Sequence, residues 1–132
     1  MGEQMTVLVV DDNDSYRGNL INFLQKQDDV QIIGQARDGV EAMSLTHTLN
    51  PDLVMMDISM PGVGGLEATR HIKERHPGTK VVFVTIHEER TYQILADILQ
   101  ADGFVCKSSA KRDIPKVLRS IRSSLVRRDR RV

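Results

Sequence analysis

The stretch LVMMDISMP, residues 53–61, decides how the chain is expected to fold. Four apolar residues run directly into a carboxylate, Asp57, and a Pro-Gly turn follows shortly after. An uninterrupted apolar run of this length is typical of a strand that is buried on both faces of a parallel sheet. Ligands of such sheets bind at the carboxyl ends of the strands. The stretch therefore predicts a buried strand that delivers one carboxylate to a binding edge.

Three further apolar stretches show the same pattern with other polar endings. Residues 7–10 are followed by Asp11 and Asp12, residues 81–84 by Thr85, and residues 104–106 by Lys107. Carboxylates, a hydroxyl and an amine are the groups that a phosphoryl-transfer site uses. One such ending is weak evidence, but four in one short chain are specific.

The order of apolar stretches and helical patterns predicts an α/β fold. We expect strands at about Met5–Val10, Val30–Ala36, Leu53–Met56, Lys80–Thr85 and Gly103–Cys106. Because single helical patterns separate them, the strands must run parallel, with right-handed crossovers. We therefore predict a doubly wound, five-stranded parallel sheet of the flavodoxin-like type, with helices on both faces. Its binding edge would gather all four polar endings.

Length and composition fit one modest domain. The 132 residues support one core, and a formal net charge of zero gives no reason to expect nucleic acid or membrane binding. A single cysteine, Cys106, excludes an internal disulfide. We see neither a signal peptide nor an apolar stretch near the roughly 20 residues that span a bilayer, so we expect a cytoplasmic protein.

The net charge of the chain changes sign near its end. Residues 1–126 hold 14 Lys and Arg against 17 Asp and Glu, whereas residues 127–132 hold four Arg against one Asp. The apolar periodicity also stops after Leu125. We therefore predict a domain over residues 1–126 and, over residues 127–132, a basic tail or the start of a linker to an effector domain.

The predicted edge would bring Asp11, Asp12 and Asp57 within a few Å of one another. Two carboxylates ~4 Å apart repel by about 4 kcal/mol at an effective dielectric constant near 20. The cluster therefore needs a shared proton or a cation, and Mg²⁺ suits ligands that are all oxygen. With the metal present, a carboxylate can attack phosphorus and form an acyl phosphate. Asp57 is the better nucleophile because it stands alone at its strand end.

These residues resemble the receiver domains of response regulators in two-component signalling, over nearly all of residues 5–126. The matching positions are the acidic pair Asp11 and Asp12, the phosphoacceptor Asp57, the hydroxyl residue Thr85 and the lysine Lys107. The resemblance implies that a sensor histidine kinase phosphorylates Asp57. It further implies a Mg²⁺ site made by Asp12, Asp57, the Ser59 backbone carbonyl and, through water, Asp11. Thr85 and Phe104 would be the switch residues.

The run GFVCKSS, residues 103–109, is most similar to the NarL/FixJ-type subgroup. Members of that subgroup usually carry a helix-turn-helix domain, which implies transcriptional control through a C-terminal effector domain outside this chain. Three positions depart from common receiver patterns: Ser108 stands where proline is frequent, Phe104 replaces the commoner tyrosine, and Ile86 occupies a position that usually holds a small residue.

Several alternatives stay open from the sequence. The chain could be a stand-alone receiver, or an interaction module that works without phosphorylation. A phosphatase with an Asp nucleophile is less favoured, because Ser59 stands where such enzymes place a second acid. We expect a signalling phosphoacceptor, limited to its own phosphorylation and dephosphorylation, that forms a homodimer when phosphorylated.

Overall fold

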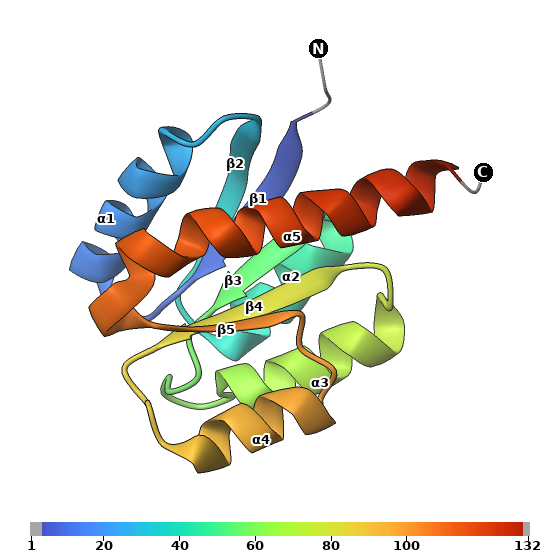
Figure 1. Ribbon diagram of the computed structural model, residues 1–132. Coiled ribbons are helices and arrows are strands. Elements are labelled where there is room, and N and C mark those ends of the chain that lie inside the picture. Colours follow the sequence, from blue (N-terminus) through green and yellow to red (C-terminus); the bar gives the residue numbers. More distant parts are fainter. Residues whose placement is uncertain (1–3, 131–132) are drawn as a thin grey trace.

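The computed structural model describes residues 4–130, with side chains through Leu125, and shows a parallel sheet between two layers of helices (Figure 1). Its elements are β1 (Met5–Val10), α1 (Asp14–Gln25), β2 (Val30–Ala36), α2 (Gly39–Leu49), β3 (Leu53–Met56), α3 (Gly65–Arg75), β4 (Lys80–Thr85), α4 (Arg90–Ile98), β5 (Gly103–Cys106), the short 3₁₀ helix η1 (Lys107–Ser109) and α5 (Ala110–Arg130). The five strands lie in the order β2-β1-β3-β4-β5, and every pair is parallel. The predicted fold class is confirmed.

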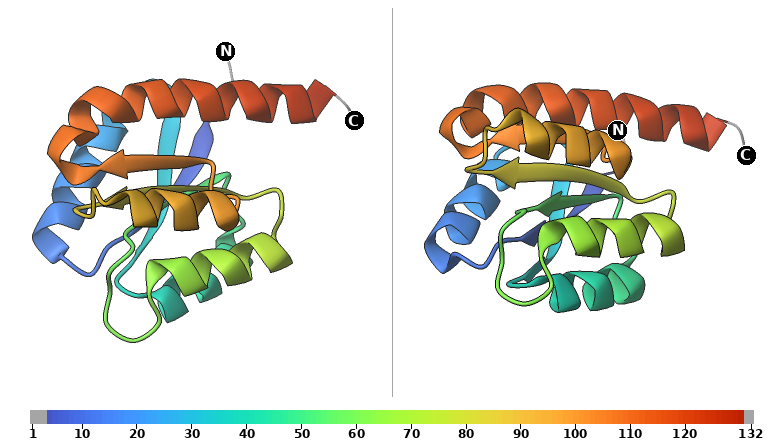
Figure 2. Two further views of the ribbon diagram at one scale, coloured as in Figure 1. Left: turned by 60° about the horizontal axis from the view of Figure 1, so that its bottom comes forward. Right: turned by 90° about the horizontal axis from the view of Figure 1, so that it is seen from below.

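Alternate residues of each strand build two separate cores, one on each face of the sheet. Val7 and Val9 of β1 pack with the buried face of α1 and α5. Leu8 and Val10 of the same strand pack with α2, α3 and α4. Figure 2 shows α5 on one side of the sheet and α3 on the other. Burial on both faces explains the apolar runs of β1, β3 and β4, whereas the edge strand β2 is partly exposed and carries Gln31 and Gln35.

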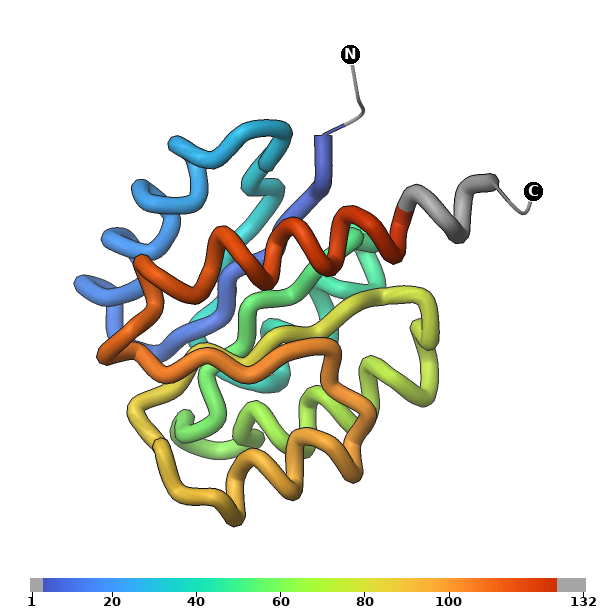
Figure 3. The backbone as a smooth tube through the Cα atoms, viewed as in Figure 1, coloured from blue at the N-terminus to red at the C-terminus, as the bar shows by residue number. Residues whose placement is uncertain are grey.

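The strand order reverses between β1 and β3, which places the carboxyl ends of these two strands side by side. The ladder continues past the apolar residues, since the Asp57 amide donates to the Val10 carbonyl at 3.0 Å. The smooth trace in Figure 3 shows both strands running through the middle of the molecule. The switch point, where such sheets bind ligands, therefore lies next to the acidic residues.

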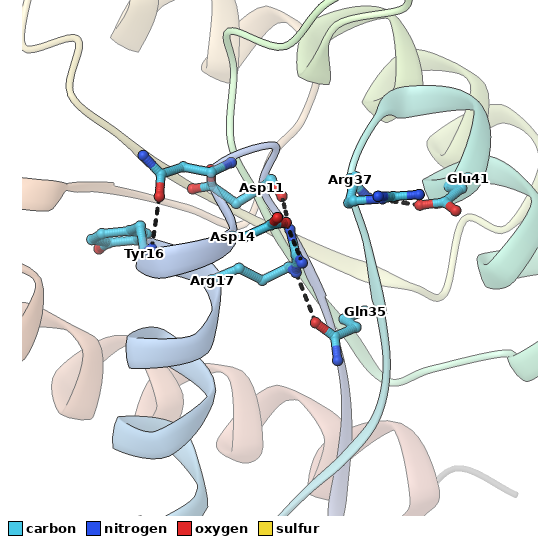
Figure 4. A network of polar contacts seen from close by, with 8 residues as sticks. Asp11, Asp14, Tyr16, Arg17, Gln35, Arg37 and Glu41 are labelled. Carbon is cyan, nitrogen blue, oxygen red and sulfur yellow. Dashed lines mark hydrogen bonds and ion pairs between the residues drawn. The ribbon is translucent and has the colours of Figure 1, made fainter.

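In the sequence, Asp38 followed three residues later by Glu41 predicts a capping box at the start of α2, and the structure shows it with one difference. Asp38 is the N-cap and its carboxylate accepts the Glu41 amide at 2.8 Å. The Glu41 carboxylate, however, accepts the amide of Arg37 at 2.8 Å, one residue before the cap (Figure 4). The two side chains still satisfy amide groups that the helix leaves without intrahelical partners.

Three details of the helices were predicted wrongly. The spacing of apolar residues predicts Val40 and Ile98 on the inner faces of α2 and α4, but they are 58% and 69% exposed. Placing Pro115 in the first turn predicts that α5 starts near Lys111 or Arg112. The helix begins at Ala110, because η1 leads directly into it. Pro115 therefore lies inside α5 instead of in its first turn, and the carbonyl that its missing N–H would bond belongs to Lys111, an exposed residue.

The predicted tail or linker covers residues 127–132, whose side chains are outside the described part of the structure. It therefore stays a prediction. The backbone of α5 is described to Arg130. Among the helices of the described chain, none combines the length and apolar character needed to cross a bilayer.

We predict opposite effects for two glycine substitutions in helices. A Cβ atom at Gly65 would collide with the Asp57 carbonyl oxygen, whereas at Gly18, on the exposed face of α1, it would meet nothing within 4 Å. Gly65→Ala should lower the free energy of unfolding by about 1–3 kcal/mol, as overpacking does. Gly18→Ala should raise it by about 0.5–1 kcal/mol. Urea unfolding measures both, and equal stability of Gly65→Ala and wild type would contradict the close contact.

Candidate functional site

Three carboxylates gather at the carboxyl edge of β1 and β3. Asp11 and Asp12 follow β1, Asp57 follows β3, and one oxygen from each lies within 4.8 Å of the others. Asp11 and Asp57 are 1% and 6% exposed, while Asp12 is exposed. The pairing of two adjacent strands thus concentrates negative charge at a place where water screens it little.

Lys107, directly after β5, approaches this cluster from another strand. Its Nζ lies 2.8 Å from Asp11 Oδ2 and 3.8 Å from Asp57 Oδ2, so the stronger ion pair is with Asp11. The same Nζ lies 4.2 Å from the centre of the Tyr16 ring, a cation–π distance. One ammonium group offsets one carboxylate, which leaves the site acidic.

Burial and crowding change the acid–base properties of the site. Burial, followed by the charge of Asp11, raises the pKa of Asp57 to about 6, although Lys107 acts in the opposite direction. Burial, followed by the charges of Asp11 and Asp57, raises the pKa of Tyr16 to about 12, so its phenol stays protonated near neutral pH. The carboxylate of Asp57 is therefore unfavourable in the metal-free site.

Thr85, the last residue of β4, is fully buried, and its hydroxyl accepts the His87 amide at 3.2 Å. The His87 ring makes two further contacts. Its Nε2 lies 2.6 Å from Ser59 Oγ, and its ring stacks on Tyr92 of α4 with centroids 4.3 Å apart. His87 therefore links the loops after β3 and β4 to α4.

Sequence reasoning missed this contribution of His87, although a signal was present. Ser59 stands two residues after Asp57, and His87 stands two residues after Thr85. Because both are strand ends at the same edge of neighbouring strands, equal offsets can place the two side chains face to face.

The two remaining predicted residues have less defined surroundings. Phe104 lies on β5, pairs in register with Phe83 and is partly buried against the core beneath α2, α3 and α4. Ser59 has an exposed side chain in the loop after β3. The switching role of Phe104 and the metal-binding role of the Ser59 carbonyl stay predictions.

The chemistry of the donor set fits the expected Mg²⁺. The atoms that converge are carboxylate oxygens, which hard divalent cations prefer, and no His or Cys belongs to the cluster among the described residues. The exposed position of Asp12 leaves one side of the cluster accessible to water, which Mg²⁺ usually retains.

Comparison with known proteins gives consistent results. The family model of the response regulator receiver domain matches residues 7–119. The chain is 39% identical over 115 residues to the response regulator GacA of Pseudomonas viridiflava, covering 87% of this chain and 54% of that protein. The chain therefore spans about half the length of the curated relatives it matches.

Solved structures agree with this result. A LuxR-family two-component response regulator from Aurantimonas sp. SI85-9A1 superposes with a TM-score of 0.88 at 28% identity, covering 92% of this chain and 87% of that one. The signal receiver domain of the putative response regulator NarL from Mycobacterium tuberculosis gives a TM-score of 0.85 at 28% identity, covering 92% and 98%. These relatives support the NarL/FixJ-type subgroup.

We predict that the contribution of Asp57 to the stability of the metal-free protein falls as pH rises from about 4 to about 6. In this window the folded state binds the Asp57 proton more tightly than the unfolded state, because the folded pKa is raised to about 6. At pH 7 Asp57→Asn should therefore be more stable than wild type by about 1–3 kcal/mol, and the difference should vanish near pH 4. Urea unfolding in chelator at both pH values measures this. Equal stability at pH 7 would contradict the raised pKa.

Proposed function

The chain belongs to the response regulator receiver domain family, and on that premise we propose that Asp57 accepts a phosphoryl group from a sensor histidine kinase. The observation that carries the proposal is the meeting of Asp11, Asp12 and Asp57 with Lys107 at one sheet edge. Metal-dependent phosphoryl transfer needs carboxylates for the cation, one of them as acceptor, and a positive charge for the transferred group.

In the proposed reaction an Asp57 carboxylate oxygen attacks phosphorus, and the bond between phosphorus and the kinase histidine nitrogen breaks. The electron pair of that bond stays on the nitrogen. A pKa of about 6 for Asp57 means that most molecules carry the nucleophilic carboxylate at neutral pH. Asp12, Asp57, the Ser59 carbonyl and, through water, Asp11 would hold Mg²⁺. When bound, Mg²⁺ neutralises the carboxylates and the phosphoryl oxygens.

Thr85 is proposed to respond to the new charge. Its hydroxyl accepts the His87 amide and so keeps its own proton for donation to a phosphoryl oxygen. Movement of Thr85 toward the phosphoryl group would pull on His87, whose ring contacts Ser59 and Tyr92. Phe104 would then repack beside α4. A local charge would in this way bias a packed element with two arrangements.

The proposed output is transcriptional control through a helix-turn-helix effector domain, which alone would contact DNA. The coverage of about half of each curated relative and the resemblance to LuxR-family regulators support this output. We place the protein in the cytoplasm, where a kinase and DNA can both reach it. The alternatives are a stand-alone receiver and a phosphorylation-independent module. Absence of Mg²⁺ binding would favour the module, and turnover of a small phosphoester would favour a phosphatase.

We predict that Asp57 is the phosphorylation site and that Asp12 is needed for Mg²⁺. Incubation with a small phosphodonor and Mg²⁺ should add one acid-stable, base-labile phosphoryl group by intact mass, and Asp57→Asn should abolish it. Mg²⁺ at about 100 times its dissociation constant should stabilise wild type by about 2.7 kcal/mol. Asp12→Ala should remove that response, while Asp28→Asn, an exposed acid away from the cluster, should keep it. Full labelling of Asp57→Asn would refute the assignment.

The proposed homodimer uses the face formed by α4, β5 and α5, with one correction. From the sequence, Asp97 and Asp102 near the end of α4 are expected to offer charge to a second copy. Asp102, however, is held within its own chain by Lys73 at 2.6 Å and by the Val81 amide at 2.9 Å. The exposed side chains of Ile94 and Ile98 on α4 offer the apolar area that a dimer needs.

We predict that beryllofluoride, an acyl-phosphate mimic, shifts the protein toward a dimer and that Ile98→Ser reverses this shift. Loss of one buried apolar side chain should weaken dimerisation about tenfold or more, since its burial contributes about 1.5–3 kcal/mol. Sedimentation equilibrium with and without the mimic measures the mass. Val40→Ser, which removes an exposed apolar residue from α2, is the control. A monomer in both states near 100 μM (roughly −5.5 kcal/mol) would exclude signalling by this contact.

A further inference from the structure

Arg17, in the first turns of α1, uses a buried guanidinium group to join three elements. Its Nε donates to Gln35 Oε1 of β2, one Nη donates to the Asp11 carbonyl at the end of β1, and the other donates to the Asp14 carboxylate at the start of α1. All three distances are 2.7 Å, and Arg17 is 9% exposed. Figure 4 shows the side chain reaching between β1 and β2.

The bonds in this turn hold both peptide groups that flank Asp12. The Asp11 carbonyl, which precedes Asp12, accepts from Arg17. The Asn13 amide, which follows Asp12, donates to the Asp11 carboxylate at 2.9 Å. Asn13 in turn accepts the Tyr16 amide at 2.9 Å and caps α1. The backbone from which the exposed Asp12 carboxylate extends is thus held on both sides.

We propose that Arg17 is a positioning residue for the cation site: it fixes the turn between β1 and α1 so that Asp12 points at the oxygens of Asp11 and Asp57. This inference rests on the proposed function. It assigns Arg17 no contact with the metal or with the phosphoryl group. Its contribution is the geometry of the turn, set before any cation arrives.

Two observations indicate that Arg17 acts on the cation site through the geometry of the turn, and not through its charge or through stability alone. The charged residues that shift the pKa of Asp57 are Asp11, Lys107 and Asp12, and Arg17 is not among them. A buried guanidinium is also a poor choice for stability alone, because apolar side chains of similar volume often stabilise a core equally well. A fork of fixed donors, in contrast, can hold a carbonyl, an amide oxygen and a carboxylate at the same time.

The expected effect is on Mg²⁺ affinity. Outer partners that orient metal ligands typically change affinity 10–100-fold when they are removed. Arg17→Met and Arg17→Lys should therefore both raise the half-saturating Mg²⁺ concentration by about 10–100-fold. Lysine keeps the charge but cannot reproduce the three-way fork, so it should not rescue. At saturating Mg²⁺ the rate of Asp57 phosphorylation by a small phosphodonor should return close to that of wild type.

The test is a titration of Mg²⁺ alone, read as melting temperature, for wild type and the Arg17 variants. Arg122→Met is the matched control, because Arg122 also donates to backbone carbonyls, those of Asp28 and Asp29, but far from the acidic cluster. It should leave the half-saturating concentration unchanged. Gln35→Leu, which removes a single partner of the fork, should give a smaller shift and serves if the Arg17 variants do not fold.

The outcomes separate this inference from the function it rests on. A wild type without any response to Mg²⁺ would overturn both. A responsive wild type with unchanged half-saturation in Arg17→Met and Gln35→Leu would overturn the positioning role alone, even if the melting temperature without metal falls. Full rescue by Arg17→Lys would also overturn it, because charge would then replace geometry as the cause.

Discussion

Mutual repulsion of three carboxylates at one sheet edge is the constraint on which the rest of the structure depends. The pairing of β1 with β3 brings Asp11, Asp12 and Asp57 together, and burial removes most of the water that would screen two of them. Lys107 relieves part of the repulsion through its ion pair with Asp11. The cluster therefore holds a charge arrangement that costs free energy, and a cation bound between the carboxylates would offset that cost.

The surrounding residues keep this arrangement in place. The Arg17 fork fixes the turn before α1, and Gly65 allows the start of α3 to pass directly against the Asp57 carbonyl. His87 connects the loops on the opposite side of the site. Arg17, Gly65 and His87 thus fix the loops around the cluster, and the two cores support the strands that carry it.

The central strands β1, β3 and β4 were predictable from the sequence because they are buried on both faces. An apolar run such as residues 81–84 has polar residues only at its ends, so both its limits and the edge it serves follow from the order of residues. The gathering of Asp11, Asp12 and Asp57 follows from the same logic. Helix faces were harder: Val40 and Ile98 have suitable spacing but lie where no second layer covers them.

Contacts between side chains distant in sequence were not predictable. Arg17 and Gln35 are 18 residues apart, and Ser59 and His87 are 28 apart. Each pair depends on the path of a loop, which residue type alone does not fix. Asp102 shows the same limit, since its charge looked free in sequence but is paired with Lys73 of α3 and bonded to the Val81 amide of β4.

The position of Lys107 has a mechanical consequence. Its ammonium group lies in the acidic cluster, while its backbone begins η1, which runs directly into α5. At 1.5 Å per residue, the 21 residues of α5 form a rod about 30 Å long. A small rotation of α5 about its first turn becomes a larger displacement at its last turn. Any segment joined after α5 would therefore move with a helix that starts at the acidic edge of the sheet.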